Sequence, residues 1–192
     1  MSSFFAFLSR LKLIRRWGLM RNTVSENVLE HTAEVAIIAN ALAIIDRKFF
    51  GGSADPDKVG MLALYHETAE VITGDLPTPV KYYNNEINAA YKDIESAAEK
   101  RIVSALPEEL KNDFAPMVSP DKNSAEYKLV KYADKLSAYI KCIEELRFSN
   151  AEFKSAYETI GRELETCDNR AVKYFMDNFI GAYSQTLDEM KL

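Results

Sequence analysis

Asn27–Phe49, NVLEHTAEVAIIANALAIIDRKF, is the stretch of sequence that decides the fold. Its apolar residues recur every three or four positions, which is the period of one face of an α-helix. Asn27 followed three residues later by Glu30 is the pattern of an N-terminal capping box, so we expect the helix to begin there. The predicted inward stripe is Val28, His31, Val35, Ile38, Leu42 and Ile45. One position of this apolar stripe is therefore a histidine.

The same helical period extends to both sides of this stretch, so we predict an all-α, single-domain bundle over residues 1–192. Asp55 and Pro56 form a helix start, and that helix is expected to run through His66 to Ala69. The other helices are predicted at about 2–15, 84–106, from 107, from 124, 150–166 and 169–187. The first should bury Phe4, Phe7, Leu8 and Leu11. The segment 75–79 is expected to be a rigid non-helical loop, because each proline disfavours helix in the residue before it.

The composition is that of a globular protein, with 47% hydrophobic and 28% charged residues. A net charge of −5 argues against nonspecific binding to nucleic acid or to an anionic membrane. A basic cluster near the N-terminus offers charge for a phosphate, or is simply a solvated helix face, which is the stronger interpretation for every member except Arg16. Its members are Arg10, Lys12, Arg15, Arg16 and Arg21.

The cysteine content and the terminal sequence predict a cytoplasmic protein. Cys142 and Cys167 stand in no metal-binding or redox spacing, so reduced thiols are expected. We find no apolar stretch of the roughly 20 residues that cross a bilayer, and the first eight residues lack a signal-peptide cleavage pattern.

The chain has two histidines, His31 and His66, and each takes an apolar position on a different predicted helix. One histidine on an apolar face is more often a satisfied core residue than a ligand. Two acids change that balance, because buried carboxylates need partners. They are Glu67, next to His66, and Asp134, on the apolar stripe of a third helix. Two imidazoles and two carboxylates suit Mn, Co, Fe or Zn. The alternatives are a solvated Glu67 and an Asp134 paired with a lysine such as Lys135.

A divalent metal at such a site could lower the pKa of bound water and polarise a phosphoryl oxygen, as hydrolysis of a phosphate ester requires. Glu70, one helical turn after His66, is then available to position the water or to protonate the leaving oxygen. Arg16 could hold the phosphate through two hydrogen bonds. Trp17 could pack on the sugar or base, although taken alone it is more often a core residue.

Several motifs in order along the chain together resemble the bacterial HD-domain 5′-deoxynucleotidases. The residues that carry the resemblance are Leu8–Trp17, Glu30-His31, Tyr65-His66-Glu67, Thr73–Tyr82 and Ala133-Asp134. The resemblance covers nearly the whole chain, and the combination is specific although each motif alone is weak. It implies an HD-type helical bundle, usually a homodimer. The implied activity uses a divalent metal to convert deoxynucleoside monophosphates to deoxynucleoside and phosphate. The implied metal is Co²⁺, with Mn²⁺ and Zn²⁺ as alternatives.

The resemblance also assigns roles by position. The implied metal ligands are His31, His66, Glu67 and Asp134. The implied catalytic residues are Glu70 and Arg16. The implied substrate contacts are Arg16, Trp17, His31, Asp75, Ser119, Pro120, Asp121, Lys122 and Asp134, although residue types and length differ from the family in the last loop.

The chain departs from the family at one position, because the His-Asp doublet reads His66-Glu67 here. Glutamate moves the carboxylate outward by one methylene, whereas metal distances vary by only a few tenths of an ångström. The helix must then shift, the side chain must fold back, or the ligand is lost. Two alternatives to the monophosphatase follow: a related hydrolase of deoxynucleoside triphosphates, and a catalytically silent nucleotide-binding protein. Few basic residues besides Arg16, Lys81 and Lys122 accompany the motifs, which favours a single phosphate.

Overall fold

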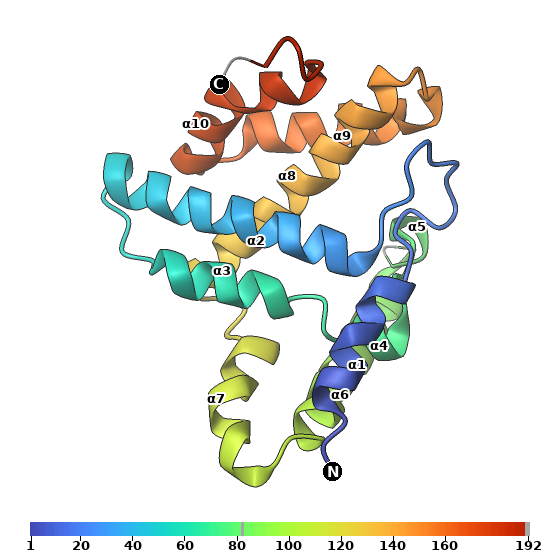
Figure 1. The fold of residues 1–192 in the computed structure, drawn as a ribbon, viewed down its shortest axis with the longest axis vertical. Helices are drawn as coiled ribbons and strands as arrows, with labels where there is room; N and C mark the ends of the chain where they lie inside the picture. The colour runs from blue at the N-terminus through green and yellow to red at the C-terminus, as the bar shows by residue number, and fades with distance from the viewer. Residues whose placement is uncertain (82, 191–192) are drawn as a thin grey trace.

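The structure is a computed structural model that describes residues 1–81 and 83–190, and Figure 1 shows these residues as a bundle of helices. The α-helices are α1 Phe4–Leu8, α2 Val28–Ile45, α3 Pro56–Tyr65, α4 Glu70–Thr73, α5 Thr78–Lys81, α6 Asn85–Ser104, α7 Glu108–Val118, α8 Ala125–Arg147, α9 Lys154–Thr166 and α10 Arg170–Asn178. The other helical turns are η1 Ser9–Leu13, η2 Asp46–Phe50, η3 Ala151–Phe153 and η4 Ile180–Ser184. Tyr82 of the resemblance motif lies outside the described residues.

The predicted all-α class is confirmed. The described part of the chain contains no β-strand, and its one bridge joins Arg15 to Asn27 in antiparallel fashion. Two backbone hydrogen bonds flank this bridge, from Arg16 N to Glu26 O at 3.0 Å and from Val28 N to Ile14 O at 2.9 Å. The segment that carries Arg16 is thereby tied to the N-terminus of α2.

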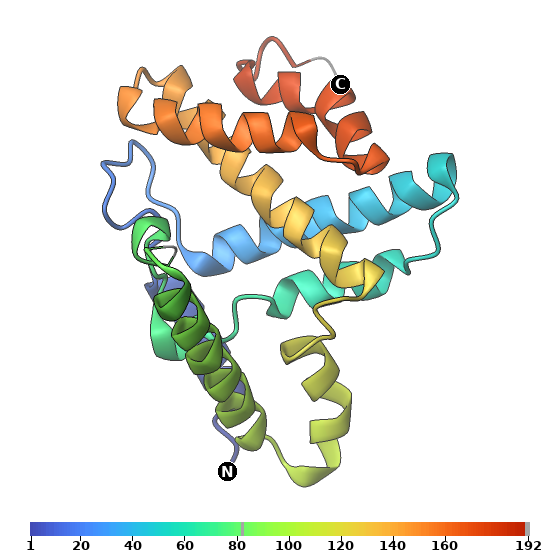
Figure 2. The same cartoon turned by 180° about the vertical axis from the view of Figure 1, so that it is seen from behind.

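Helix α2 is the centre of the core, and its predicted start and stripe are confirmed. The Asn27 side chain accepts hydrogen bonds from the backbone of Leu29 and Glu30, and the Glu30 side chain completes the capping box. All six residues of the predicted stripe are buried. Helices α3 and α8 pack against α2, and α8 crosses both on the side that faces away from the viewer in Figure 1 and toward the viewer in Figure 2.

The stretch Val28–Phe50 is long and apolar enough to cross a membrane, judged by length and composition alone, with a mean hydropathy of 1.6. The sequence analysis missed it because Glu30, His31 and Glu34 interrupt the apolar run. Half of the apolar window is buried inside the protein, and the core helix of a soluble protein has the same composition.

A smaller core holds the lower part of the molecule in Figure 1, where α1, α6 and α7 lie. It is formed by Phe4, Ile102, Leu106 and Val118. Phe4 and Leu11 are buried as predicted, whereas Phe7 is 39% exposed and the prediction for it was wrong. The chain changes from α-helix to the tighter 3₁₀ form at Ser9, which alters the spacing of one helical face.

The helix predicted through His66 to Ala69 ends instead at Tyr65. Side chains explain the break: His66 Nδ1 lies 2.6 Å from the carbonyl oxygen of Ala63, and the Thr68 hydroxyl donates to Tyr65 O at 2.7 Å. Both bonds use carbonyl groups that a continuing helix would pair with backbone N–H groups. A turn follows, and α4 begins at Glu70.

Two further boundaries differ from the prediction. Thr78 and Pro79 belong to α5, because a proline in the first turn of a helix lacks an N–H group that would be unpaired anyway. The last long helix ends at Asn178 rather than near Leu187, and a 3₁₀ turn containing Gly181 follows. Glycine is a poor helix former, which is consistent with an end at this point.

Candidate metal centre and active site

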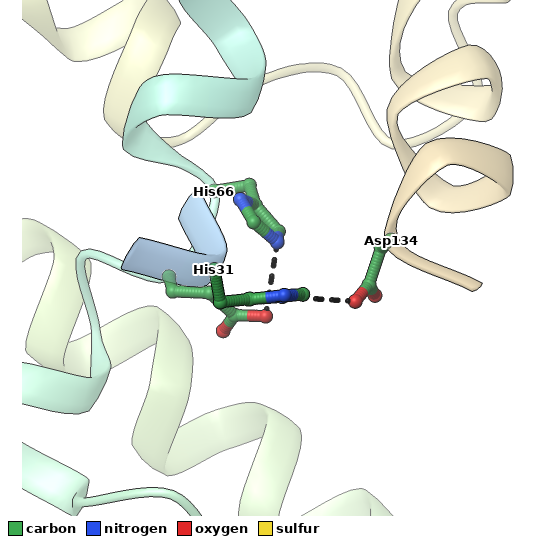
Figure 3. Close-up of side chains that lie close together, drawn as sticks. His31, His66 and Asp134 are labelled. Carbon is green, nitrogen blue, oxygen red and sulfur yellow. Dashed lines mark ion pairs between the residues drawn. The ribbon is translucent and has the colours of Figure 1, made fainter. Parts of the chain in front are cut away.

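His31 and His66 lie side by side, with ring centroids 5.5 Å apart. His31 is in the first turn of α2 and His66 follows the last residue of α3, so two different helices bring the rings together (Figure 3). The Nε2 atom of each ring is buried and has no hydrogen-bond partner among the described residues. Buried polar atoms are rarely left without a partner, so these two nitrogens point to a missing ligand.

Each Nε2 atom has a carboxylate oxygen beside it. Oδ1 of Asp134 lies 3.2 Å from His31 Nε2, and Oε1 of Glu67 lies 3.1 Å from His66 Nε2. The ligand atoms of all four residues lie within 4.8 Å of one another. Two imidazole nitrogens and two carboxylate oxygens are a donor set that suits first-row divalent metals, so these residues fit a metal ion.

His66 is held in the form that a metal ligand requires. Its Nδ1 atom faces the carbonyl oxygen of Ala63, and a carbonyl oxygen can only accept a hydrogen bond. Nδ1 therefore carries a proton, and in the neutral ring the lone pair lies on Nε2. Burial opposes a charged ring, but the neighbouring Glu67 carboxylate outweighs this effect and raises the pKa of His66. A backbone carbonyl in this position is a common way to fix the ring of a metal-binding histidine.

Glu67 reaches the cluster although it is one methylene longer than the family aspartate. It lies in the turn between α3 and α4. The sequence analysis had expected it to lie within a helix. Its carboxylate lies within reach of the ligand atoms of the other three residues.

The charges around the four residues favour ionised carboxylates. Burial opposes ionisation of Asp134, but other effects, led by the positive charge of Lys131, outweigh it and hold the Asp134 pKa well below the usual range. Burial likewise opposes ionisation of Glu67, and the neighbouring His66 lowers the Glu67 pKa to about 2. Burial and then the positive charge of Arg16 lower the pKa of His31, which keeps that ring neutral.

Glu70 differs from these two acids. It begins α4, where burial, Glu67 and Asp75 raise its pKa to about 10. A carboxyl group with such a pKa is protonated near neutral pH and can donate a proton. Glu70 lies beside Glu67, and a turn between α3 and α4, rather than one continuous helix through His66, brings it there.

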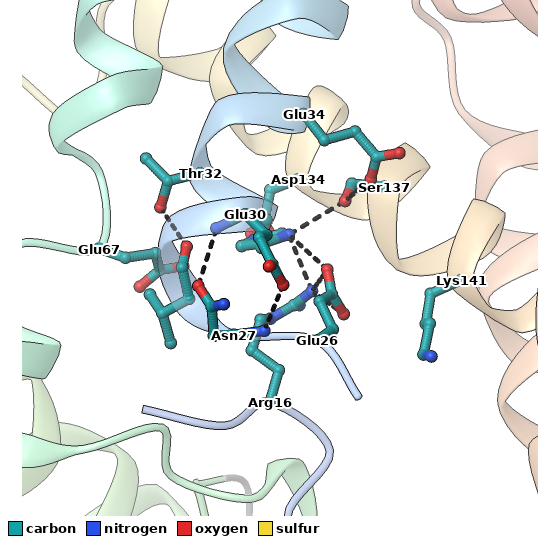
Figure 4. A network of polar contacts seen from close by, with 12 residues as sticks. Arg16, Glu26, Asn27, Glu30, Thr32, Glu34, Glu67, Asp134, Ser137 and Lys141 are labelled. Carbon is teal, nitrogen blue, oxygen red and sulfur yellow. Dashed lines mark hydrogen bonds and ion pairs between the residues drawn. The ribbon is translucent and has the colours of Figure 1, made fainter. Parts of the chain in front are cut away.

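Arg16 lies beside the N-terminus of α2, and its side chain is mostly buried. One of its terminal nitrogens, NH1, contacts both carboxylate oxygens of Glu26, at 3.0 and 3.1 Å, and lies 2.8 Å from Nδ1 of His31 (Figure 4). The other basic residues of the N-terminal cluster are exposed, which agrees with the solvated interpretation for them.

Trp17 and Asp75 lie beside Arg16. The Trp17 backbone has φ 57°, a left-handed conformation that is uncommon outside glycine. Its ring packs on Phe153 with centroids 5.3 Å apart, while the buried Nε1 atom has no hydrogen-bond partner within residues 1–81 and 83–190. The Trp17 ring is therefore partly a core group. Burial raises the pKa of Asp75, and the neighbouring Arg16 partly offsets this effect.

The loop 119–122 is held from α6. The Ser119 hydroxyl donates to Glu99 Oε2 at 2.8 Å, and Lys122 Nζ lies 3.9 Å from the other oxygen of Glu99. Asp121 accepts from the backbone of Asn123 within the loop. None of the contacts given for Ser119, Pro120, Asp121 or Lys122 in the described part of the chain reaches the histidines.

The sequence analysis missed Lys131, Glu26 and Glu34. Lys131 forms an ion pair with Asp134, whereas the predicted partner Lys135 pairs with Glu163 at 2.5 Å. The spacing of three residues on α8 could have indicated Lys131. Glu26 and Glu34 reach the site only through contacts that a sequence does not reveal.

Comparisons with known proteins find relatives over nearly the whole chain. A family model described as 5′-deoxynucleotidase YfbR-like matches residues 3–183. The chain is 47% identical over 190 residues to a 5′-deoxynucleotidase of Vibrio cholerae, covering 98% of both chains. It is 48% identical to 5′-deoxynucleotidase YfbR of Shigella boydii, covering 98% of this chain and 96% of that protein.

Two solved structures share the fold. An HD-domain phosphohydrolase of Listeria innocua has a TM-score of 0.82 at 23% identity, covering 94% of this chain and 88% of that one. The HD phosphohydrolase of cyanophage S-2L, solved with dA and one catalytic Zn²⁺ ion, has a TM-score of 0.63 at 19% identity, covering 94% of this chain and 96% of that one.

Proposed function

The chain belongs to the YfbR-like family of 5′-deoxynucleotidases, and from that premise we propose how its residues remove the 5′-phosphate from a deoxynucleoside monophosphate. The observation that carries the proposal is the meeting of two buried Nε2 atoms without partners and two carboxylates within 4.8 Å. His31, His66, Glu67 and Asp134 hold one divalent cation. When bound, such a cation lowers the pKa of water and polarises a phosphoryl oxygen.

The identity of the cation is a separate part of the proposal. We place Co²⁺ first, as the family resemblance implies, with Mn²⁺ and Zn²⁺ next. Mixed nitrogen and oxygen ligands suit all three ions. The cyanophage protein, which shares the fold, was solved with one catalytic Zn²⁺ ion, and this supports a single metal ion here.

Arg16 binds the phosphate and Glu70 supplies a proton to the leaving 5′-oxygen. A guanidinium group pairs with two phosphate oxygens at once, and the proton turns a poor alkoxide leaving group into an alcohol. The raised pKa of Glu70 supports the second role, because the carboxyl group must hold a proton before it can donate one.

Trp17 and Asp75 bind the sugar, with His31 and Asp134 bordering the phosphate. The buried indole N–H of Trp17 supports this role, because it has no partner within the described protein. Ser119, Pro120, Asp121 and Lys122 form a loop that lines the outer part of the substrate site. The half-exposed Lys131, paired with Asp134, adds positive charge on the same side.

We further propose that the protein is a cytoplasmic homodimer that acts as a single domain and binds neither nucleic acid nor membrane. The net charge of −5 supports the last point. The outward face of α2 supports the dimer, because Ile37 is 72% exposed and Ile44, two turns further on, is 48% exposed. Light scattering should give twice the chain mass of 21.7 kDa, and Ile37→Glu should halve it.

A phosphatase assay tests the proposed reaction. Free phosphate released from deoxynucleoside and ribonucleoside monophosphates is measured with Co²⁺, Mn²⁺, Zn²⁺ or Mg²⁺, beside tripolyphosphate released from deoxyadenosine triphosphate. We expect phosphate from the deoxy monophosphates. Tripolyphosphate as the main product would favour the triphosphate hydrolase, and no turnover with any metal would favour a silent nucleotide-binding protein.

A further inference from the structure

The Nδ1 atom of His31 lies beside two groups that favour different protonation states of this atom. NH1 of Arg16 lies 2.8 Å away and Oγ of Ser137 lies 3.0 Å away (Figure 4). A guanidinium group can only donate, so the contact with Arg16 needs a bare Nδ1 atom. A hydroxyl group can donate or accept, so Ser137 is compatible with either state of the ring.

Glu34 decides which role Ser137 plays. The single hydroxyl hydrogen of Ser137 is donated to Oε2 of Glu34 at 2.5 Å. Ser137 is fully buried, and in this arrangement its oxygen has only lone pairs to offer to the imidazole. The Ser137–Glu34 pair therefore favours a His31 ring that carries its proton on Nδ1.

A proton on Nδ1 is also what a metal ligand at Nε2 requires. A neutral imidazole has one proton, so a bare Nε2 lone pair and an N–H group at Nδ1 belong to the same tautomer. For His66 the carbonyl of Ala63 enforces that tautomer, because a carbonyl has no other role. For His31, Arg16 favours the tautomer with a bare Nδ1 atom, and Ser137 favours the tautomer with a proton on Nδ1.

We propose that Ser137, held by Glu34, is a positioning residue that keeps His31 protonated on Nδ1, and that metal binding at Nε2 makes Arg16 give up its contact with this ring. The proposal rests on the metal site proposed above. Arg16 can stay paired with Glu26, which it contacts at 3.0 and 3.1 Å, while its guanidinium nitrogen moves away from the Nδ1–H group, because two donors cannot face each other at 2.8 Å. One N–H group of Arg16 is thereby freed. Metal loading thereby prepares the donor that the phosphate needs.

The first test measures the affinity for Zn²⁺ by competition with a chelator. Ser137→Ala removes the acceptor for Nδ1–H, and we expect the dissociation constant to rise about 10- to 100-fold, the usual effect of losing an outer-shell partner. Ser137→Thr keeps the hydroxyl and should restore most of the affinity. Glu34→Ala lets the serine hydroxyl turn and should cause a smaller loss in the same direction.

Thr32→Val is the matched control, because the Thr32 hydroxyl is also buried and next to His31 in sequence but donates to Val28 O at 2.7 Å. Its Zn²⁺ affinity should equal that of wild type. Thermal unfolding of each metal-free variant checks that it folds. A Ser137→Ala protein that binds Zn²⁺ as tightly as wild type would overturn the proposal, and a Glu34→Ala protein that does so would remove Glu34 from it.

The second test reads the tautomer directly. Because the chain has two histidines, a ¹⁵N spectrum of the imidazole nitrogens contains only two rings. With Zn²⁺ bound we expect both rings to carry the proton on Nδ1, and in Ser137→Ala we expect His31 alone to lose this defined state. A Zn²⁺ ion bound through Nδ1 of His31 would refute the inference while leaving the metal site intact. Failure of wild type to bind any Zn²⁺ would instead refute the proposed function.

Discussion

The rings of His31, in α2, and His66, directly after α3, lie with their centroids 5.5 Å apart, and neither Nε2 atom has a hydrogen-bond partner in the part of the chain that the structure describes. A shared cation is the simplest group that would satisfy both atoms. His66→Ala removes one ligand, so we expect bound metal and turnover to be lost together, because both depend on one site. Elemental analysis of the purified protein and a phosphate-release assay give the two readings. Turnover at the wild-type rate in His66→Ala would exclude the metal mechanism.

Substitutions of Glu67 test how the site accommodates a carboxylate that is one methylene longer than the family aspartate. Glu67→Gln removes the charge that pairs with His66 Nε2 at 3.1 Å but keeps the length, so we expect metal affinity to fall at least tenfold. Glu67→Asp keeps the charge and restores the family doublet, so it should still bind metal and turn over substrate. Metal titration and the phosphate assay compare the two variants. If Glu67→Asp were active and wild type were not, the silent protein would be the correct interpretation.

Glu70→Gln should separate chemistry from metal binding. The carboxyl group is placed beside Glu67 and is not among the four ligand residues, so we expect metal content to stay unchanged. Loss of the proton donor should lower kcat about 10²- to 10⁴-fold, the usual contribution of a general acid. Steady-state kinetics and elemental analysis on the same sample provide the measurements. A metal-free Glu70→Gln protein would show that this residue has been assigned the wrong role.

Arg16→Lys tests the phosphate contact, with Arg15→Lys as the control. Lysine keeps the charge but cannot pair with two oxygens, so kcat/KM should fall about 10- to 100-fold, the equivalent of one charge-assisted hydrogen bond. Arg15 is exposed, and its exchange should leave kcat/KM unchanged. Equal effects of the two substitutions would mean that the N-terminal charge acts only at long range.

Local signals in the sequence predicted much of this architecture, because they act within one turn of helix. The caps at Asn27, Asp55 and Ser124 each need only a side chain and the next three residues, and all three are present. The stripe of α2 likewise follows from helical period alone. The break after Tyr65 was missed because His66 and Thr68 bond to backbone carbonyls, which propensity does not encode.

The candidate ligands could be predicted, whereas the groups that orient them could not. Histidines and acids on apolar stripes stand out because burial is costly for them. Ser137 and Glu34 meet across two helices that are far apart in sequence, and nothing in either segment indicates the other. Lys131 and Lys135 both flank Asp134, and only the packing of α9, which brings Glu163 to Lys135, decides between them.

The loop that carries Arg16 and Trp17 depends on one buried carboxylate, Glu145 of α8. Burial raises its pKa, but hydrogen bonds from Lys141, Thr23 and Asn150 outweigh this effect and lower the pKa to about 2. Thr23 contributes both its backbone N–H, at 2.9 Å, and its hydroxyl, at 2.6 Å. Glu145 is 1% exposed, so these bonds are sheltered from water and fasten the loop to α8.

Glu145→Gln should therefore destabilise the fold by about 3 kcal/mol, because it leaves the buried Lys141 ammonium without its counter-charge. Glu144→Gln is the matched control, since Glu144 is exposed and should change the free energy of unfolding by less than about 0.5 kcal/mol. The folded pKa of Glu145, about 2, lies below its ordinary value of 4.5, so its stabilisation is complete above pH 4.5 and is lost as the pH falls toward 2. Urea unfolding of metal-free protein at pH 7 and pH 3 measures this. The difference in stability between wild type and Glu145→Gln should shrink at the lower pH, and a constant difference would show that the loop is not held by this charge.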